Sequence, residues 1–569
     1  MKNQEIAKIL YNIALYLEMK EDLVFKIKAY EKAAQIIESL PEDVGITYER
    51  GGIAALEKIR GIGRGIAEKI EELVKTGKLR YYEKLKKEVP VDIETLSRIE
   101  GMGPRKIFVL YKKLKVKNVK DLEAVAKKGK ISKLEGFGEK SEKNILKGIG
   151  FVKKSKGRYL IGYTFSLATE IEKRLNDLPY VKKAVIAGSF RRRKETVGDI
   201  DILVISNEPE KVMDYFTKMK EVINVFGKGK TKSTVLLENG MDADLRVVKE
   251  KSYGAALNYF TGSKTHNVAL RRIAIQKKLK LSEYGLFSGQ KQIAGKTEEE
   301  LYKTLGLRYI EPEMRENTGE IEIAKKNKLP KLIKYGSLLG DLQIQTTWSD
   351  GSHTIEQMAN AAKQHGLKYI SITDHTKSLA WGIDEKKLLK QGKEIDKLNK
   401  KISGFRILKG AELNIMKDGG VDIKSSVLKD LDCVGAGIHS AFRLSRSDMT
   451  KRIINVMENE HVDILFHPTG RIIQKREACD MDIEKIIDTA KRTGTILEID
   501  SPPGRLDLKD DHIRMAVSVG AKLCIDTDAH DMSHYNYLNL GIAQARRGWA
   551  QKKDVINTLP LKSMLKKLK

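Results

Sequence analysis

Two aspartates on an apolar, β-branched run constrain this chain more than any other feature. Residues 188–204 read Gly-Ser-Phe-Arg-Arg-Arg-Lys-Glu-Thr-Val-Gly-Asp-Ile-Asp-Ile-Leu-Val. In a strand successive side chains point to opposite faces, so Asp199 and Asp201 share one face and Ile200 the other. Neighbouring carboxylates repel unless a cation lies between them, and Mg²⁺ typically joins one or two carboxylates to substrate phosphates. The alternative is a basic turn followed by a strand with two solvent-facing acids.

A second strand pattern supplies a third acid. In residues 241–248, Asp242, Asp244 and Arg246 alternate onto one face. The periodicity does not choose between the two aspartates. With the Gly-Ser turn and the cations upstream, the pattern favours a phosphate-and-metal site.

Composition sets the class of protein. A chain of 569 residues is long enough for several domains, and its net charge of +29 favours a polyanion as partner. A Lys- and Glu-rich composition is also typical of heat-adapted proteins. The three cysteines form no Cys-x-x-Cys pair, which fits a reducing cytosol. No apolar run approaches the roughly 18 residues of a membrane span, so we expect a soluble, cytoplasmic protein with no membrane partner.

An internal repeat occupies the first 150 residues. Residues 59–63, 99–103 and 134–138 each place apolar-x-Gly-apolar-Gly between helical segments. Two glycines allow a tight turn whose backbone N–H groups open the next helix, and such an N-terminus can hold a phosphate. Read as structure alone, each is a glycine-capped helix join. A cation follows each copy, so the pattern favours helix-hairpin-helix elements that grip a DNA backbone through these glycines: Gly61, Gly63, Gly101, Gly103, Gly136 and Gly138.

The middle of the chain resembles a known family. Gly-Ser, Asp-x-Asp and the later acid-apolar-Arg strand are similar to the palm of the beta-type nucleotidyltransferases. Residues 259–271, Tyr-Phe-Thr-Gly-Ser-Lys-Thr-His-Asn-Val-Ala-Leu-Arg, narrow the resemblance to the family X DNA polymerases. The resemblance covers residues 1 to about 318 and places the third acid at Asp244.

The resemblance implies the roles of the site residues. Asp199 and Asp201 would bridge two Mg²⁺ or Mn²⁺ ions, and Asp244 would hold the catalytic ion and help to remove the 3′-hydroxyl proton. Two such ions stabilise the attacking and leaving oxygens of an in-line displacement. The remaining positions form three groups: Gly188, Ser189, Arg192 and Gly198 at the triphosphate, Tyr259, Phe260 and Gly262 at the sugar, and Asn267 and Arg271 at the incoming base and template.

The same resemblance places a lyase nucleophile at Lys69. A nucleophilic lysine needs a pKa depressed by burial or by cationic neighbours. Lys26, Lys28 and Tyr30 would form a 5′-phosphate pocket around it. The chain departs from the lyase pattern at Phe25, where such members often have His, and at Gly65, where they have another Lys.

Strand and helix patterns alternate after residue 337, as in a β/α barrel. Side chains of metal-ligand type gather near the strand ends: Asp350, Asp374, His375, Glu412, His439, His467, Asp526, Asp528 and His530. This part resembles the polymerase and histidinol phosphatase (PHP) domain, through Thr-Asp-His, Gly-Ala-Glu, His-Pro and Asp-Ala-His.

The departure from the PHP pattern lies at its first motif. Where the family opens with His-x-His, this chain has Gln343 and Gln345. An amide oxygen is a weak donor to Zn²⁺ or Mn²⁺, so the first of three sites, completed by Glu412 and Asp528, is expected to be weakened. Two ligand sets remain whole: Glu412, His439 and His467, and Asp350, His375 and His530. We expect one or two bound metals and reduced or altered 3′–5′ exonuclease or phosphoesterase activity.

The interpretation is a multidomain α+β and α/β protein. Its expected parts are a helical 5′-phosphate or lyase-like domain (1–85), a helix-hairpin-helix subdomain (86–150), a nucleotidyltransferase palm (151–250), a nascent-base-pair-binding subdomain (251–318), a charged linker (319–337) and a distorted β/α barrel (338–569). We expect a monomeric, gap-filling DNA polymerase whose partners are gapped or primed double-stranded DNA and dNTPs. The alternatives are a template-independent nucleotidyltransferase, a non-catalytic DNA-end-binding scaffold and a phosphoesterase of small metabolites.

Overall fold

The computed structural model describes residues 1, 3–40, 43–59, 61–97, 99, 102–155 and 157–569. Arg60, Glu100 and Gly101 of the predicted hairpins lie outside the described residues. The chain forms two compact units, Met1–Lys156 with Ile472–Ala478, and Gly157–Arg471 with Cys479–Lys569.

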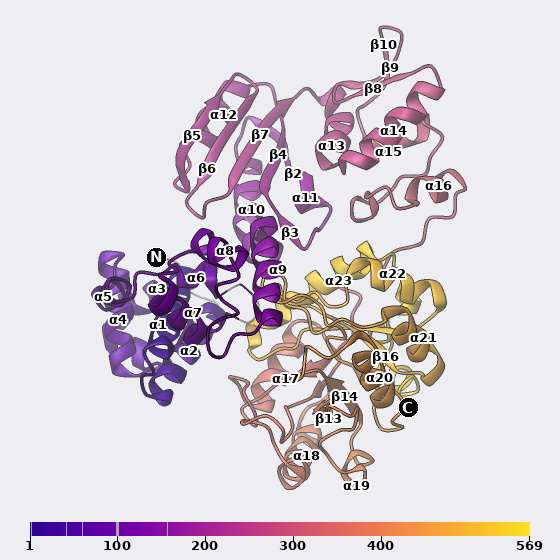
Figure 1. The fold of residues 1–569 in the computed structure, drawn as a ribbon. Coiled ribbons are helices and arrows are strands. Elements are labelled where there is room, and N and C mark those ends of the chain that lie inside the picture. The colour runs from indigo at the N-terminus through magenta and orange to yellow at the C-terminus, as the bar shows by residue number, and fades with distance from the viewer. Residues whose placement is uncertain (2, 41–42, 60, 98, 100–101, 156) are drawn as a thin grey trace. The chain divides into compact units, whose positions relative to one another are not determined.

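The N-terminal unit is helical because its apolar residues recur every three to four positions. On the first helix Ile6, Leu10, Ile13 and Leu17 are all buried. They pack in a single core with apolar residues of the helices that follow. The helices are α1 (Asn3–Met19), α2 (Val24–Ser39), α3 (Val44–Glu57), α4 (Arg64–Thr76), α5 (Arg80–Glu88), α6 (Ile93–Leu96), α7 (Pro104–Leu114), α8 (Val119–Lys127) and α9 (Glu139–Ser155) (Figure 1).

The predicted palm contains a five-stranded sheet in the order β2-β4-β7-β6-β5. Strand β4 runs parallel to β7, and the other pairs are antiparallel. A small two-stranded sheet pairs β1 with β3. The elements are β1 (Tyr159–Leu160), α10 (Ile161–Asn176), β2 (Val181–Ile186), α11 (Gly188–Arg191), β3 (Thr196–Val197), β4 (Asp199–Ser206), α12 (Pro209–Thr217), β5 (Val222–Lys228), β6 (Lys232–Leu237) and β7 (Asp242–Val248).

Alternation along β4 separates its two faces, as the sequence predicted. Ile200, Ile202 and Val204 pack in one core with apolar residues of α10 and α12. Leu203 and Ile205 point the other way, into a second cluster with Ala256 and Leu257. Asp199 and Asp201 belong to that second face, so the acids lie opposite the helices that support the sheet.

A small subdomain follows the palm sheet. It consists of α13 (Tyr253–Thr261), α14 (Lys264–Gln276), β8 (Lys280–Ser282), β9 (Gly285–Ser288), β10 (Lys291–Ala294), α15 (Glu298–Thr304) and α16 (Glu320–Lys325). Helix α16 lies inside the stretch expected to be a charged linker. Its first residue, Glu320, is fully buried and accepts a hydrogen bond from His266 at 2.7 Å, so the start of this stretch packs against α14.

The C-terminal part is a parallel barrel, in agreement with the strand–helix alternation of the sequence. Its seven strands pair in chain order from β11 to β17, and a bridge from Ile344 to Ala529 brings the two edges together. The elements are β11 (Gly340–Ile344), α17 (Ile355–Gln364), β12 (Tyr369–Ile372), α18 (Glu385–Lys401), β13 (Arg406–Asn414), α19 (Ser425–Leu428), β14 (Cys433–Gly437), α20 (Arg446–Met457), β15 (Ile464–Leu465), α21 (Ile483–Thr493), β16 (Ile496–Asp500), α22 (Asp510–Val519), β17 (Leu523–Asp526), α23 (Leu538–Arg547) and α24 (Leu561–Leu565). The strands are buried on both faces, as in a parallel sheet covered by helices.

Two expectations about the chain as a whole can be compared with the structure. Cys433, Cys479 and Cys524 are free and buried. Among the residues that the structure describes, no helix is both long enough and apolar enough to cross a bilayer.

Candidate active sites and metal centres

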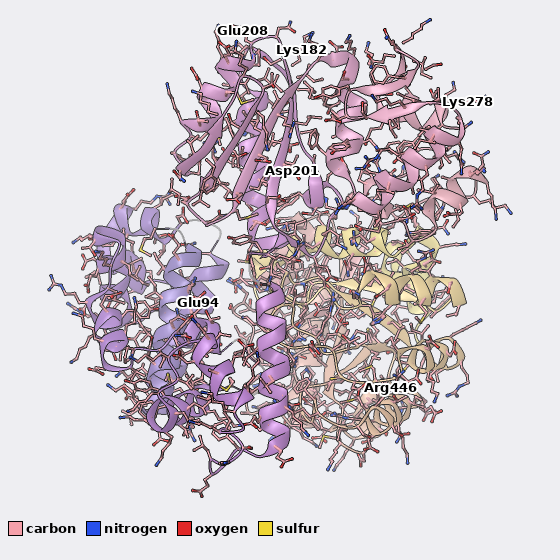
Figure 2. The ribbon with its side chains drawn as sticks, turned by 45° about the horizontal axis from the view of Figure 1, so that its top comes forward. Glu94, Lys182, Asp201, Glu208, Lys278 and Arg446 are labelled. Carbon is pink, nitrogen blue, oxygen red and sulfur yellow. The ribbon has the colours of Figure 1, made fainter. Side chains whose placement is uncertain are left out.

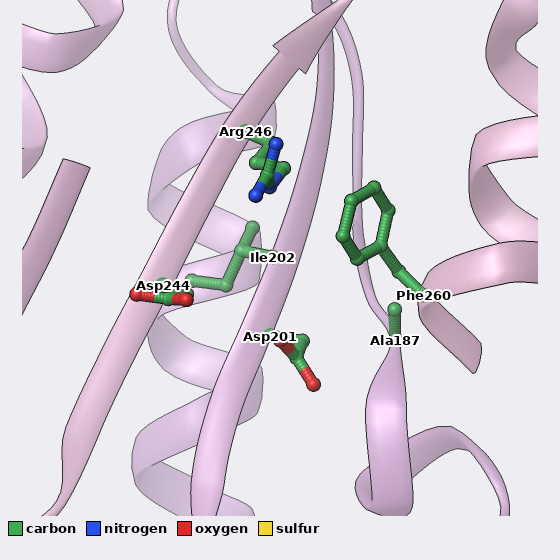
Figure 3. Close-up of a pocket in the computed structure, with 6 residues that line it drawn as sticks. All are labelled: Ala187, Asp201, Ile202, Asp244, Arg246 and Phe260. Atoms are coloured by element: carbon green, nitrogen blue, oxygen red, sulfur yellow. The ribbon is translucent and has the colours of Figure 1, made fainter. Parts of the chain in front are cut away.

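The palm acids come together through strand register. Asp201 of β4 pairs with Asp244 of β7, and Asp199 pairs with Asp242. Asp201 and Asp244 line a small pocket with Ala187, Ile202, Arg246 and Phe260. Figure 3 shows the two carboxylates on neighbouring strands, with Phe260 on the opposite side of the pocket from Asp244. Asp242 is exposed and does not line this pocket, so the geometry favours Asp244 as the third acid.

The palm carboxylates are difficult to ionise together. Burial and the carboxylates of Asp199 and Asp244 raise the pKa of Asp201 to about 7. Burial by neighbouring groups and the Asp244 carboxylate also raise the pKa of Asp199, although one side of Asp199 remains open to solvent. Three oxygen donors that repel one another fit a site completed by a divalent cation such as Mg²⁺ or Mn²⁺. Figure 2 places Asp201 near the start of β4, whereas Glu208 lies beyond the opposite end of that strand.

Asp244 is oriented by its own neighbours. The hydroxyl of Thr234 donates to its Oδ1 at 2.5 Å, and Lys232 Nζ lies 3.3 Å from its Oδ2. Both partners come from β6, the strand next to β7 in the sheet. No local sequence pattern predicts these partners, because their pairing with Asp244 depends on the order of strands in the sheet.

The Gly-Ser turn lies directly against Asp201. Gly188 begins the short helix α11 with φ of +59°, a conformation that favours glycine. A Cβ at this position would overlap Oδ2 of Asp201. Glycine is therefore required here both by backbone conformation and by the close approach of the carboxylate, while Gly198 has neither constraint.

The predicted triphosphate arginine is held on two sides. Arg192 Nε donates to Glu316 Oε1 at 3.1 Å, and its Nη1 donates to the carbonyl of Thr261. A Cβ at Gly262 would lie 3.0 Å from Nη1, so this glycine leaves room for the guanidinium. Ser189, the other predicted phosphate-contacting residue of this turn, lies in α11 beside Gly188.

The predicted sugar-contacting aromatic residues form a compact pair. The rings of Tyr259 and Phe260 meet edge to face with centroids 5.1 Å apart, and Arg246 lies 4.8 Å from the Phe260 ring. Asn267 is buried, and its Nδ2 donates to the carbonyl of Tyr259 at 2.7 Å. Arg271 Nε donates to the Asn267 carbonyl at 3.4 Å. In this structure Asn267 thus fixes the backbone of the aromatic pair, a role that the sequence did not predict.

A buried group of charged side chains connects the palm to the small subdomain that follows it. Glu298 lies between two arginines, with Arg191 Nη2 at 2.6 Å and Arg315 Nη1 at 2.5 Å. Although burial opposes ionisation, these two guanidinium groups lower the pKa of Glu298 to about 2. Tyr309 donates to the same carboxylate at 3.2 Å. No local sequence pattern predicts this group, because its members are up to 124 residues apart.

In the N-terminal unit, Lys69 lies beside Tyr81, a residue that the sequence pattern did not predict at this site. Lys69 Nζ donates to the Gly65 carbonyl at 2.8 Å and lies 5.3 Å from the ring centroid of Tyr81. Lys26 lies 5.9 Å from the same ring, and Tyr30 stacks on it. Partial burial lowers the pKa of Lys69, and the Lys26 cation adds to this effect. The exposed Lys28 instead pairs with Glu31 at 2.6 Å.

The described hairpin glycines mark helix starts. Gly63, Gly103 and Gly138 immediately precede α4, α7 and α9, and each carbonyl accepts a hydrogen bond from the first turn. Gly61 and Gly136 have φ of +95° and +78°, so the tight turns of these two hairpins use a left-handed glycine. Backbone N–H groups at such helix starts suit phosphate oxygens.

In the barrel, Glu412 is the centre of the predicted metal-ligand side chains. Its Oε1 lies 2.9 Å from Nε2 of both His439 and His467, and its Oε2 lies 3.4 Å from His375 Nδ1. Although burial opposes ionisation, these histidines hold the pKa of Glu412 well below its usual range. His439 Nδ1 is 2.8 Å from Asn414 Oδ1, an arrangement that keeps Nε2 directed at Glu412.

Two groups of ligand atoms are spaced for metal binding. In each group the ligand atoms lie within 4.8 Å of one another. One group consists of Asp350, His375 and His530, and the other of His375, Glu412 and His439. Mixed imidazole and carboxylate donors fit Zn²⁺ or Mn²⁺. The group with Asp350 is one of the two complete ligand sets that the sequence predicted. The second shares Glu412 and His439 with the other expected set and adds His375.

The glutamines at the first motif face the same carboxylate. Gln345 Nε2 donates to Glu412 Oε2 at 2.7 Å, and Gln343 Nε2 donates at 3.1 Å. Their amide oxygens are buried and have no hydrogen-bond partner. The same is true of Oδ1 of Asp528. Because N–H donors occupy Glu412 Oε2, the residues present do not fit a metal at the first of the three sites of the PHP pattern.

Two other predicted strand-end acids have structural partners. Asp374 accepts hydrogen bonds from Thr346, Ser349 and Gln391. Asp526 accepts from the Leu342 amide at 2.7 Å and from Asn557. These fully buried acids tie β11 to its neighbours.

Known protein families match successive parts of the chain, and one relative matches almost its full length. The matching family descriptions are the DNA polymerase beta palm (165–277), the DNA polymerase beta thumb (256–316), a helix-hairpin-helix domain (1–79), a SAM-like helix-hairpin-helix tandem (93–150) and a PHP domain (341–501). The chain is also 38% identical over 573 residues to the DNA polymerase/3′-5′ exonuclease PolX of Bacillus subtilis (strain 168), with 99% of each protein covered. The chain belongs to the family X DNA polymerases.

Two further relatives match one part of this family X polymerase each. DNA polymerase lambda of Rattus norvegicus is 26% identical over 321 residues, 50% of this chain and 52% of that protein. A probable phosphatase of Thermoanaerobacter sp. (strain X514) is 32% identical over 192 residues, 31% of this chain and 72% of that protein. The family and the fold class expected from the motifs are therefore confirmed.

Proposed function

We propose that this family X polymerase fills short gaps in DNA by template-directed nucleotidyl transfer. The observation that carries the proposal is the carboxylate group of Asp199, Asp201 and Asp244 beside the Gly188 turn. In this proposal gapped double-stranded DNA and dNTPs are the partners, and the protein acts as a monomer. The domain boundaries expected from the sequence remain part of the proposal.

The palm residues would divide the work of the reaction. Asp199, Asp201 and Asp244 would hold two Mg²⁺ or Mn²⁺ ions, which when bound stabilise charge on the attacking and leaving oxygens. Arg192 would bind triphosphate oxygens through the edge of its guanidinium that Glu316 and Thr261 leave free. Asp244, held by Thr234, would take the proton of the primer 3′-hydroxyl. Tyr259 and Phe260 would line the sugar.

A single-nucleotide gap-filling assay tests this proposal. The substrate is a gapped duplex with a 5′-phosphate, supplied with the four dNTPs singly and with Mg²⁺ or Mn²⁺. We expect addition of the nucleotide that the template dictates, and we expect Asp201→Ala to abolish it. Asp242→Ala is the matched control, because Asp242 is an exposed acid of the same sheet outside the pocket. Indiscriminate addition would indicate a template-independent transferase, and no addition by the wild type would indicate a scaffold.

We also propose that the barrel binds one or two Zn²⁺ or Mn²⁺ ions and has reduced or altered 3′–5′ exonuclease activity. The supporting observation is the pair of amide hydrogen bonds from Gln343 and Gln345 to Glu412. Primer shortening without dNTPs, together with a count of bound manganese, tests it. Full-strength shortening that His439→Ala abolishes, or three bound ions per chain, would contradict it.

A further inference from the structure

The basic turn after the predicted phosphate cradle touches the barrel. Arg547, the last residue of α23, donates from Nη1 to the carbonyl oxygen of Arg192 at 2.9 Å. The same Nη1 donates to Glu316 Oε1 at 3.3 Å, and that oxygen also accepts from Arg192 Nε at 3.1 Å. One barrel arginine therefore contacts both the backbone of Arg192 and the carboxylate that orients its side chain.

Arg547 is itself fixed in place. Its side chain is 1% exposed, and its Nη2 forms an ion pair with Asp510 at the start of α22. A guanidinium with donors on a carboxylate, a carbonyl and a second carboxylate has little freedom to turn. The barrel thus offers the turn a rigid cation rather than a mobile surface charge.

A second contact fixes the far end of the same turn. Glu195 Oε1 accepts from Arg471 Nη2 at 2.5 Å and from Gln544 Nε2 at 2.7 Å. Arg471 follows β15, and Gln544 lies one helical turn before Arg547 on α23. Residues 192–195 are consequently held at both ends by barrel side chains, while Gly188 and Ser189 lie just upstream.

The position of Arg192 explains why this matters for the nucleotide. Its Nε faces Glu316 and its Nη1 faces the Thr261 carbonyl, so these acceptors set the plane of the guanidinium. An arginine binds phosphate oxygens well when its planar fork is oriented beforehand. If Glu316 moved, the plane would turn with it.

We propose that Arg547 of the barrel is a positioning residue for the nucleotide triphosphate, acting through Glu316 and the backbone of Arg192. This inference rests on the proposed polymerase function. It makes the barrel a structural partner of the polymerase site, independently of any metal that the barrel binds. Arg547 touches neither the nucleotide nor the reacting atoms.

The test compares full-length variants in single-nucleotide gap filling. Arg547→Gln is expected to raise the KM for dNTP about five- to tenfold while kcat changes less than about twofold, because orientation of the triphosphate is lost. Arg547→Lys is expected to rescue poorly, since an ammonium lacks the fork that reaches Asp510 and Glu316 together. Glu316→Gln alone should raise KM similarly, and the double variant should not add the two effects.

Arg514→Gln is the matched control. Arg514 is another barrel arginine at a contact with the polymerase part, where Nη1 donates to the Thr318 carbonyl at 2.7 Å, but it does not touch Glu316 or Arg192. Equal KM effects in Arg514→Gln and Arg547→Gln, a lower kcat with unchanged KM, or additive effects in the double variant would overturn the inference. If Arg547→Gln does not fold, an unchanged KM in Glu316→Gln overturns it. Failure of the wild type to add nucleotide would instead refute the proposed function.

Discussion

Gln345 donates a hydrogen bond of 2.7 Å to Oε2 of Glu412, at the position where PHP domains carry a metal-ligating histidine. Gln343 donates to the same oxygen at 3.1 Å. The carboxylate therefore receives amide hydrogens on one oxygen and two histidines on the other. Hydrogen-bond donors thus face one oxygen of Glu412, and imidazole nitrogens of two predicted metal ligands, His439 and His467, face the other.

Restoring both histidines should restore the missing metal. We expect Gln343→His with Gln345→His to bind one more manganese ion per chain and to shorten primers at least about tenfold faster, because imidazole is a far better donor than an amide. Metal analysis of the purified protein and an exonuclease assay without dNTPs measure the two effects. Gln364→His is the control, since Gln364 is exposed on α17. Unchanged metal content in the double variant would show that the site is closed for another reason.

Gly188 should tolerate no side chain. Alanine there would combine a φ of +59° with a Cβ that overlaps Oδ2 of Asp201. We expect Gly188→Ala to lower kcat/KM for nucleotide addition by about a hundredfold or more, since a displacement of about 1 Å at a reacting centre has that effect. Gly227→Ala is the control, because a Cβ on that palm-sheet residue meets nothing within 4 Å. Equal activity of the two variants would refute the requirement for glycine at position 188.

The sequence predicted the parts of the site that depend on local periodicity. The period of two placed Asp199 and Asp201 on one face of β4, and strand pairing then set Asp244 beside Asp201. Strand β11 has no apolar pattern of its own, because Asp341 and Gln343 put polar side chains in a buried strand. Their side chains form hydrogen bonds with Thr527 and Glu412, far along the chain, so the nearby sequence does not show these partners.

The partners of several site side chains could not be predicted from the sequence. Arg191 is one of the cations that precede the Asp-x-Asp pair in the sequence, and its guanidinium pairs with Glu298 at 2.6 Å. The position of Asn267 at the incoming base stays a prediction, and in the structure its side-chain amide donates to the Tyr259 carbonyl. In both cases the side-chain type fits either role, and only the fold determines which partner lies within reach.

Lys69 should form a Schiff base with a 5′-deoxyribose phosphate if it is the nucleophile of a lyase. Borohydride should trap a DNA adduct that Lys69→Ala loses and that Lys75→Ala keeps, because Lys75 pairs with Glu71 on the outer side of α4. Burial and Lys26 lower the pKa of Lys69, so its neutral amine is available at a lower pH than that of an exposed lysine. Lys26→Gln removes one of these causes, and half-maximal trapping should therefore move to higher pH. Absence of any adduct in the wild type would end the lyase hypothesis.

The buried ion pairs of Glu298 with Arg191 and Arg315 should make the stability of the small subdomain sensitive to acid. The pKa of Glu298 is lowered to about 2 in the folded protein, so its contribution to stability is complete above the unfolded value near 4.5 and is lost as the pH falls towards 2. We expect Glu298→Gln to destabilise this subdomain by about 3 kcal/mol at pH 7, because it leaves buried arginines unpaired, and to flatten the dependence between pH 4.5 and 2. Hydrogen exchange of amides in α13 and α15 measures the local effect, with exposed Glu299→Gln as the control. A Glu298→Gln protein that keeps the acid sensitivity of the wild type would assign it to other carboxylates.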